Sequence, residues 1–385
     1  MLRAHRPKCL LVINSLAGGG AERVFTTLVG DLVNFRDRCD FTVALLDNED
    51  SEAYSLPDWI EVHRLASGAS LFRSVSGLCK LVRTIRPDVC LSFLTRANCA
   101  AIIACRSYGG KAIISERVNT TAHLSGGVKS VVNRALVRLL YPRAAAVVAV
   151  SQGVKETLCQ EYGVSSGQVT VIPNPVDVTR IEKLASEPAP FDIANGDWAT
   201  MGRLVPTKNS ALAVRAFVRS ESEGRLFILG DGPLRQQIET LVDELGARDR
   251  VVICGFHANP YAILGRCAGY ILPSNAEGFP NAMVEAMALG KPVVATDCPS
   301  GPAEILEARI VSAEPACGRG GMLVKCEDEA MMATAIQALQ DKVLRDQLGE
   351  LARERALDFS VERATNAFWS IIQAELAVPD RRVAA

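Results

Sequence analysis

The chain has 385 residues, of which 49% are hydrophobic, and this length and composition favour two domains with buried cores over one. Its formal net charge of −1 argues against general nucleic-acid binding. The charge is unevenly distributed, because residues 1–175 carry a net charge of +6 and residues 176–385 a net charge of −7. A basic first half and an acidic second half indicate two domains that meet different partners.

The twelve cysteines form no CxxC pair and have no zinc-like spacing with the four histidines. Most of them lie in apolar runs, which predicts reduced thiols in the core of a cytosolic protein. No run reaches the roughly 18 uncharged apolar residues that a membrane-spanning helix requires. The first apolar run, CLLVI, is too short for a signal peptide, so we expect a cytoplasmic location.

The first half of the chain alternates apolar strand-like runs with helix-like runs. The predicted strands are 9–14, 40–47, 88–94, 111–116, 144–151 and 168–174. Helices are predicted after the glycine-rich turn 17–23 and at 71–86, 97–107 and 128–140. Repeated strand–helix units with apolar strands are typical of a doubly wound, mostly parallel sheet.

The pattern restarts after a Pro-containing linker region, for which the candidates are 173–178 and 185–197. Further strands are predicted at 198–204, 225–233, 250–256, 269–274 and 292–297. A last helix, near 361–376, has an apolar stripe that favours packing back onto the first domain. The stripe consists of Ala364, Ala367, Phe368, Ile371 and Ile372.

The predicted fold class is therefore α/β, with two doubly wound, Rossmann-like domains facing a central cleft. The first domain comprises residues 1–175 together with the C-terminal segment 361–385, and the second comprises residues 176–360.

Two glutamates stand out in the stretch SNAEGFPNAMVEAMALGKPVVATD, namely Glu277 and Glu285. The run Asn281–Leu289 has helical spacing, and Pro280 suits the first position of that helix. At about 1.5 Å per residue, Pro280 and Glu285 lie roughly 7–8 Å apart along the axis. The two carboxylates are thus spaced to touch opposite ends of one elongated ligand, at the carboxyl end of the preceding strand.

The stretch GRLVPTKN places two cations, Arg203 and Lys208, just beyond a strand of the second domain. An arginine fork and a lysine point charge suit a diphosphate, and the alternative is a pair of solvated surface charges. The turn GDGP (230–233) ends another strand of the same sheet, so its backbone is expected to line the same site.

The turn AGGGAER follows the first strand and opens a helix. Gly18, Gly19 and Gly20 allow a ligand to approach the backbone, and the helix N-terminus attracts phosphate. Arg23 stands where the dinucleotide fingerprint requires glycine, which disfavours NAD binding, although Asp47 at the end of the second strand leaves that alternative open. A tight turn without a ligand is the remaining interpretation.

The stretch SERVN ends a strand of the first domain with polar residues. Glu116, Arg117, Asn119 and the nearby His123 are candidates for binding an acceptor in that domain. The alternatives are a surface ion pair between Glu116 and Arg117 and an exposed, uninvolved histidine.

Two stretches of the first domain, 71–86 and 128–143, are basic and amphipathic. Helices of this kind lie on anionic membranes, so peripheral membrane contact is one expectation. The other is that both are ordinary surface helices with their apolar sides in the core.

Taken together, the motif Glu277-Gly-Phe-Pro-Asn with Glu285, the upstream Arg203 and Lys208, and the GGGAER turn resemble the retaining, nucleotide-sugar-dependent glycosyltransferases of family 4. Members of that family have the GT-B fold, and the resemblance covers nearly the whole chain. SFL…AN (92–98), SER (115–117) and IPNPVD (172–177) are similar to members that extend polyprenyl-diphosphate-linked or other cell-surface glycans.

The resemblance implies a role for each motif residue. Arg203 and Lys208 would hold the donor diphosphate, Glu285 the ribose hydroxyls and Glu277 the transferred sugar, so the residues implied as catalytic are Glu277, Arg203 and Lys208. The residues implied in donor binding come from both domains and are Gly19, Gly20, Gly202, Gly230, Gly278, Phe279, Pro280, Asn281 and Glu285. Many relatives have a histidine where Arg117 stands, so that histidine's role does not carry over; His123 or a backbone carbonyl is the candidate replacement.

The resemblance further implies transfer of a hexose or N-acetylhexosamine from a nucleotide diphosphate sugar, with a UDP-sugar favoured over a GDP-sugar. The acceptor would be a polyprenyl-diphosphate-linked or cell-surface glycan at the inner face of the cell membrane. No metal or other cofactor is expected, because the two cations would stabilise the leaving diphosphate. Two alternatives stay open: a sugar-nucleotide epimerase or phosphorylase of the same fold, and a non-catalytic nucleotide-sugar-binding protein.

Overall fold

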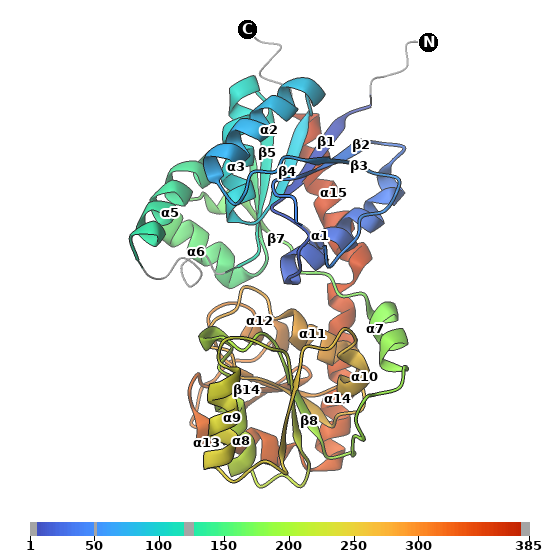
Figure 1. Cartoon of the computed structure of the whole chain (residues 1–385), viewed down its shortest axis with the longest axis vertical. Helices are drawn as coiled ribbons and strands as arrows, with labels where there is room; N and C mark the ends of the chain where they lie inside the picture. The colour runs from blue at the N-terminus through green and yellow to red at the C-terminus, as the bar shows by residue number, and fades with distance from the viewer. Residues whose placement is uncertain (1–5, 50–51, 119–126, 379–385) are drawn as a thin grey trace. The chain divides into compact units, whose positions relative to one another are not determined.

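The computed structural model describes residues 6–49, 52–118 and 127–378, with side chains from residue 131 onward in the last range. It divides the chain into two compact units (Figure 1), which are residues 1–175 with 361–385 and residues 176–360. Each unit has its own parallel sheet and its own core, so each is described separately.

The sheet of the first unit is entirely parallel, with the strand order β3-β2-β1-β4-β5-β6-β7. Its strands are β1 (Lys8–Ile13), β2 (Asp40–Leu45), β3 (Glu61–Arg64), β4 (Val89–Phe93), β5 (Lys111–Glu116), β6 (Ala146–Ala149) and β7 (Val169–Val171). Its helices are α1 (Gly20–Asp31), α2 (Leu71–Ile85), α3 (Thr95–Tyr108), α5 (Gly127–Leu140), α6 (Gln152–Tyr162) and α15 (Val361–Ala377).

Helix α15 packs against α1 and β4 of the first unit, beside strands that are more than 250 residues away in sequence (Figure 1). Phe368 and Ile372 of its predicted apolar stripe are fully buried, and Ala367 and Ile371 are partly buried against the same core. Trp369 stacks on Phe35 with ring centroids 4.8 Å apart. The prediction that the last helix returns to the first domain is confirmed.

The sheet of the second unit has the order β10-β9-β8-β11-β12-β14-β13, parallel except for the antiparallel pair β13–β14. Its strands are β8 (Trp198–Met201), β9 (Leu226–Leu229), β10 (Val251–Gly255), β11 (Gly269–Leu272), β12 (Val293–Thr296), β13 (Ala316–Gly318) and β14 (Gly321–Val324). Its helices are α7 (Val178–Ala185), α8 (Ser210–Arg219), α9 (Arg235–Glu244), α10 (Tyr261–Leu264), α11 (Asn281–Ala288), α12 (Pro302–Leu306), α13 (Glu329–Ala338) and α14 (Lys342–Ala356).

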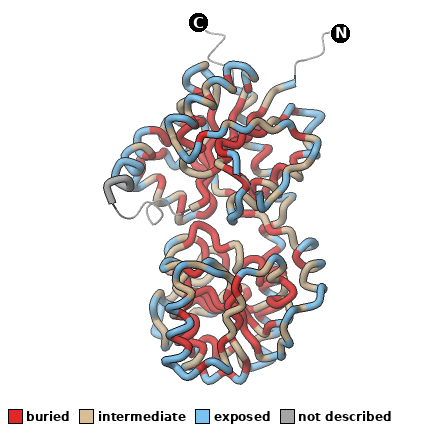
Figure 2. The backbone as a smooth tube through the Cα atoms, viewed as in Figure 1, coloured by how far each residue is buried: buried red, intermediate tan, exposed pale blue. Residues whose placement is uncertain are grey.

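In both units the central strands are the most buried part of the chain, because helices cover both faces of each sheet (Figure 2). This burial explains why the strands are near-continuous apolar runs. The predicted fold class, two parallel-sheet Rossmann-like domains, is confirmed. Among the strands, the polar edge strand β3 and the hairpin β13–β14 were missing from the prediction, and among the helices α6, α13 and α14 were missing.

Candidate functional site

The parallel strands of each sheet reverse their order once, between β1 and β4 in the first unit and between β8 and β11 in the second. At such a switch point the connections leave on opposite faces and open a crevice at the carboxyl ends of the strands. In the second unit the segments that follow β8 and β11 are joined directly. The N–H of Asn275 donates to the Thr207 carbonyl at 2.8 Å, and the Asn209 amide donates to the Asn275 side chain at 3.1 Å.

Glu277, in the loop after β11, lies at this switch point and is 8% exposed. Its carboxylate accepts hydrogen bonds from the Lys208 ammonium at 2.6 Å and from the Ser274 hydroxyl at 2.7 Å. Lys208 ends a short 3₁₀ turn, Pro206–Lys208, whose following residue Asn209 caps helix α8. The fold therefore brings together two predicted site residues that are 69 positions apart.

Arg203, the second predicted cation, stands two residues beyond β8 with an exposed side chain. Within the described residues this side chain has neither an ion pair nor a hydrogen-bond partner. Its positive charge is thus available to a ligand, whereas the Lys208 charge is already matched by Glu277.

Gly202 and Gly230, both predicted in the site, pack backbone against backbone. Gly230 has a φ of +143°, and a Cβ at this position would overlap the carbonyl oxygen of Gly202. The Gly202 N–H donates to the Leu229 carbonyl at 3.0 Å, which holds the two strand ends together. Glycine is required here by close approach of the chain as well as by the dihedral angle.

Helix α11 begins at Asn281, so Pro280 is its N-cap residue; the prediction that Pro280 occupies the first helical position is wrong by one residue. Phe279 and Pro280 are buried, with the Phe279 ring 5.4 Å from the ring of Phe359 and the Pro280 ring beside Gly301. Gly278 is buried as well, so the whole segment from Gly278 to Pro280 lies in the interior.

Glu285 lies in α11 and is 4% exposed, and its carboxylate accepts a hydrogen bond from the Tyr261 hydroxyl at 3.2 Å. The buried phenol of Tyr270 donates a hydrogen bond to the Met201 carbonyl at 3.1 Å. Burial raises the pKa of Tyr270, and the negative charges of Glu277 and Glu285 raise it further. Both carboxylates are therefore within electrostatic reach of one side chain of β11.

The glycine-rich turn of the first unit leads into α1, which begins at Gly20 after the N-cap residue Gly19. The Glu22 carboxyl folds back against Gly19, where a Cβ would overlap it. Asp47, the acid of the dinucleotide alternative, is held in a bidentate ion pair by Arg96. This pairing removes the carboxylate that would hold a ribose in a dinucleotide site.

Glu116 and Arg117 are interior residues with exposed fractions of 0% and 4%, so the alternative of a surface ion pair is wrong. Tyr141 donates a hydrogen bond to Glu116, and Thr95 donates another at 3.4 Å. Burial raises the pKa of Glu116 to about 7, and these hydrogen bonds act in the opposite direction. The predicted role of Glu116 in acceptor binding stays a prediction.

The Arg117 guanidinium lies over the neighbouring rings of Phe93 and Phe368, at 5.0 and 5.1 Å from their centroids. It donates to the Ile172 carbonyl at 3.2 Å and to the Asn174 side chain at 2.9 Å. Burial lowers the pKa of Arg117 to about 9. These contacts join the ends of β5 and β7 to α15. The other two acceptor candidates, Asn119 and His123, lie outside the described residues.

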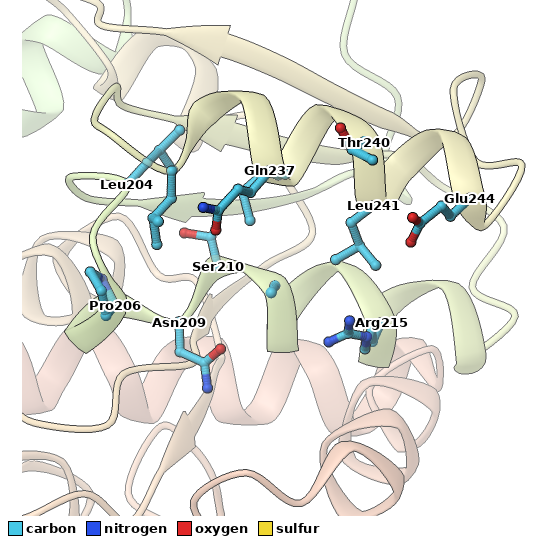
Figure 3. Close-up of a pocket in the computed structure, with 12 residues that line it drawn as sticks. Leu204, Pro206, Asn209, Ser210, Arg215, Gln237, Thr240, Leu241 and Glu244 are labelled. Atoms are coloured by element: carbon cyan, nitrogen blue, oxygen red, sulfur yellow. The ribbon is translucent and has the colours of Figure 1, made fainter.

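A groove of about 350 Å³ runs between α8 and α9 of the second unit (Figure 3). Gln237 and Leu241 point from α9 toward α8, which contributes Ser210 and Arg215. The groove is lined by none of the residues predicted to bind the donor, so it is separate from the Lys208–Glu277 pair.

Sequence reasoning missed several polar residues that adjoin the predicted ones. Ser274 and Tyr261 bind the two glutamates, and Asn14, Thr95 and Arg96 line a cavity in the first unit. Asn14 directly follows β1 and Thr95 lies two residues beyond β4, so their position near the carboxyl ends of central strands was the available signal. The partners of Glu277 and Glu285 required the tertiary fold.

The described part of the chain contains no group of three or more histidine, cysteine, aspartate or glutamate side chains arranged to hold a metal ion. Among the same residues, none of the helices combines the length and the apolar character needed to cross a bilayer.

Comparison with known proteins gives a match for each unit. Residues 18–180 match the family model "Glycosyltransferase Family 4", and residues 197–355 match "Glycosyl transferases group 1". The chain is 31% identical over 364 residues to the N-acetylgalactosamine-N,N'-diacetylbacillosaminyl-diphospho-undecaprenol 4-alpha-N-acetylgalactosaminyltransferase of Campylobacter jejuni, covering 91% of this chain and 94% of that protein. A second transferase of that organism, which acts on a GalNAc-containing diphospho-undecaprenol glycan, is 26% identical over 383 residues, covering 95% and 98% of the two chains.

Solved structures with the same fold include Anabaena HepE in complex with UDP, with a TM-score of 0.74 and 20% identity over 95% of this chain and 100% of that one. The sucrose-phosphate synthase of Thermosynechococcus elongatus superposes with a TM-score of 0.79 and 17% identity over 97% and 100% of the two chains. Both units match glycosyltransferase family models, and the chain covers 94% of the length of a relative to which it is 31% identical. This chain therefore belongs to the family 4 glycosyltransferases, which have the GT-B fold.

Proposed function

We propose that this glycosyltransferase moves a hexose or N-acetylhexosamine from a nucleotide diphosphate sugar to a lipid-linked or cell-surface glycan, with retention of anomeric configuration and without a metal ion. The observation that carries the proposal is the ion pair between the partly exposed Lys208 and the buried Glu277 at the switch point of the second unit, with the exposed Arg203 five residues before Lys208. The Campylobacter relatives, whose names state transfer of N-acetylgalactosamine to diphospho-undecaprenol glycans, support the acceptor class.

The second unit is the proposed donor domain. Arg203 and Lys208 bind the diphosphate, Glu285 the ribose hydroxyls and Glu277 the transferred sugar. The close packing of Gly202 on Gly230 holds the two strand ends together beside the phosphates, and the backbone of residues 278–281 meets phosphate and sugar oxygens. Gly19 and Gly20 contribute from the glycine-rich turn of the first unit.

A UDP-sugar is the proposed donor, because HepE was solved in complex with UDP and with UDP-glucose.

Charge stabilisation on the leaving diphosphate is the proposed source of catalysis. As the glycosidic C–O bond of the donor breaks, negative charge grows on the β-phosphate, which the Arg203 fork and the Lys208 ammonium stabilise. The acceptor hydroxyl attacks from the same face, and its proton passes to the departing phosphate oxygen. Lys208 is held in place by Glu277 before the donor arrives, so little reorganisation is needed when the charge develops.

The first unit, with α15, is the proposed acceptor domain, and its positive charge suits an acceptor that carries a diphosphate on an anionic membrane. Its helices α2 and α5 expose large apolar side chains beside arginines, which supports peripheral contact with the inner face of the cell membrane. These side chains are Phe72, Val131, Val132 and Leu139.

A transfer assay with the purified chain, a radiolabelled UDP-N-acetylgalactosamine donor and a polyprenyl-diphosphate-linked N-acetylhexosamine acceptor tests the proposal. We expect a lipid-linked product in wild type and a loss of at least 100-fold in Lys208→Ala. Lys183→Ala, which removes an exposed lysine of α7, is the matched control and should behave as wild type. Release of free sugar or its epimer without acceptor extension would favour the epimerase alternative, and nucleotide binding without turnover would favour the non-catalytic one.

A further inference from the structure

A cavity of about 500 Å³ lies within the first unit, at the switch point of its sheet. Asn14 follows β1 and Leu94 and Thr95 follow β4, so the cavity opens at the carboxyl ends of the two central strands. Its remaining walls come from the starts of α1, α2 and α3 and from α5. By the rule for open parallel sheets, this is where a ligand of the first unit belongs.

The cationic side chain of this cavity is already neutralised. Arg96 donates to Asp47 from both terminal nitrogens, one of these hydrogen bonds being 3.1 Å long, and it also donates to Ser74 at 3.2 Å. Asp47 in turn accepts the Ala69 N–H at 3.0 Å. Although burial acts to raise the pKa of Asp47, the bonds from Arg96 and Ala69 outweigh it and lower the pKa, so the pair stays ionised.

The other titratable side chains in the described lining are Cys99, whose thiol stays neutral because burial raises its pKa, and Glu22, in the first turn of α1. Burial raises the pKa of Glu22, while a hydrogen bond from its own N–H acts to lower it. An anionic ligand would therefore meet a carboxyl group and a guanidinium already matched by Asp47. This charge balance disfavours uronic acids and phosphorylated or sulfated sugars.

The uncharged lining combines hydrogen-bond acceptors with apolar surface. The side-chain oxygen of Asn14 is buried and has no hydrogen-bond partner in the structure, so it needs a donor such as a hydroxyl or an amide N–H. Leu71, Leu136 and Val137 form an apolar wall that can accept a methyl group or the apolar face of a pyranose ring.

We propose that this cavity binds the terminal sugar of the acceptor glycan and selects a neutral, acetamido-bearing pyranose over an anionic one. The amide N–H and the hydroxyls of such a sugar satisfy Asn14 and Glu22, and its methyl group lies against the apolar wall. The inference rests on the proposed function of the first unit as the acceptor-binding domain. It makes Glu22 the residue that discriminates against negatively charged acceptor sugars.

Binding of methyl glycosides to the full chain can be measured without donor, by titration monitored with saturation-transfer NMR. This measurement tests the inference separately from the glycosyl-transfer reaction. We expect methyl N-acetylgalactosaminide to bind at least tenfold more tightly than methyl galacturonide. Asn133→Trp, at an exposed position of α5 that lines the cavity, should weaken binding of the first glycoside at least tenfold. Ala135→Trp, at an exposed position of the same helix outside the lining, is the matched control and should bind as wild type.

Charge selection is tested with Glu22→Gln, which removes the carboxylate and keeps its shape. The ratio of the affinity for methyl N-acetylgalactosaminide to that for methyl galacturonide should fall by at least fivefold in this variant. The ratio should stay unchanged in Glu156→Gln, which alters an exposed position of α6. Equal binding of neutral and anionic glycosides, no binding of either, or equal effects of the two tryptophan substitutions would overturn the inference. Thermal stabilisation by UDP reports on the proposed donor site, so its loss would count against the proposed function and not against this cavity.

Discussion

The Lys208 ammonium lies 2.6 Å from the Glu277 carboxylate, although the two residues come from segments that follow different strands of the second sheet. Glu277 is 8% exposed, so its charge is stabilised by this lysine and by the Ser274 hydroxyl more than by water. The pair holds a cation in place at the strand ends before any donor is present.

Removing the lysine tests this relationship. Lys208→Ala should lower kcat/KM for the donor by roughly 10²–10³-fold, about 3–4 kcal/mol, since a preorganised charge contact is lost. Because the substitution also leaves Glu277 without its counter-ion, Glu277→Gln and the double variant complete a cycle measured by steady-state kinetics. Losses that simply add would contradict the coupling inferred from the 2.6 Å contact.

Gly230→Ala tests the close approach of the chain at the strand ends. A Cβ would overlap the Gly202 carbonyl oxygen, so the free energy of unfolding in urea should fall by about 3 kcal/mol or more. Gly246→Ala is the matched control, since Gly246 also has a positive φ but has open space around its Cβ position. Gly246→Ala should lower the free energy of unfolding by about 1–2 kcal/mol, from backbone strain alone. Equal losses would show that the Gly202 contact is unimportant.

The buried acid Glu116 should make stability depend on pH. Burial raises the pKa of Glu116 from 4.5 to about 7, so between these values the folded state retains a proton that the unfolded state has released. Its contribution to the free energy of unfolding therefore falls as pH rises through this window, by about 3 kcal/mol. As the pH rises from 4.5 to 8, the free energy of unfolding of Glu116→Gln, measured in urea titrations, should increase by this amount relative to that of wild type. Parallel pH curves for the two proteins would refute the assignment, and Glu156→Gln on the surface is the control.

Membrane contact through α5 is tested by vesicle co-sedimentation. Val132 and Leu139 are more than half exposed on a helix that also carries Arg134 and Arg138. Replacing both apolar residues by glutamate should release the protein from phosphatidylglycerol vesicles at low salt. Val311→Glu, at an 86% exposed position of the second unit, should have no effect. Unchanged sedimentation of the α5 variant would mean that this helix does not lie on the membrane.

Metal independence has a simple test. Transfer should continue at the wild-type rate in excess EDTA, since Arg203 and Lys208 carry the charge stabilisation in the proposed mechanism. Inactivation by the chelator that Mg²⁺ or Mn²⁺ reverses would refute this part of the proposal.

The sequence predicted the strands of both cores because buried parallel strands are apolar runs, and it predicted α15 because its stripe has helical spacing. It missed β3, whose sequence EVHR is polar because this edge strand is partly exposed, and the very short hairpin β13–β14. The strands β3 and β13 lack the apolar run on which strand prediction depends, and the apolar run of β14, Met322 to Val324, is only three residues long.

For the site, the sequence identified Glu277, Lys208 and Gly230 from motif and position, but it could not show their contacts. Local sequence gave no sign that Glu116 and Arg117 are buried, because Tyr141 and Phe368, which cover them, are 25 or more residues away. The Arg96–Asp47 pair was missed for the same reason, and with it the neutral character of the cavity in the first unit.

Thermal stabilisation by nucleotides in the absence of metal tests the central claim, a diphosphate site at Arg203 and Lys208, most directly. UDP at 100 times its dissociation constant should stabilise the wild-type chain by about 2.7 kcal/mol and should stabilise Lys208→Ala much less. No shift with UDP, GDP or ADP, or the same shift in both proteins, would contradict the account.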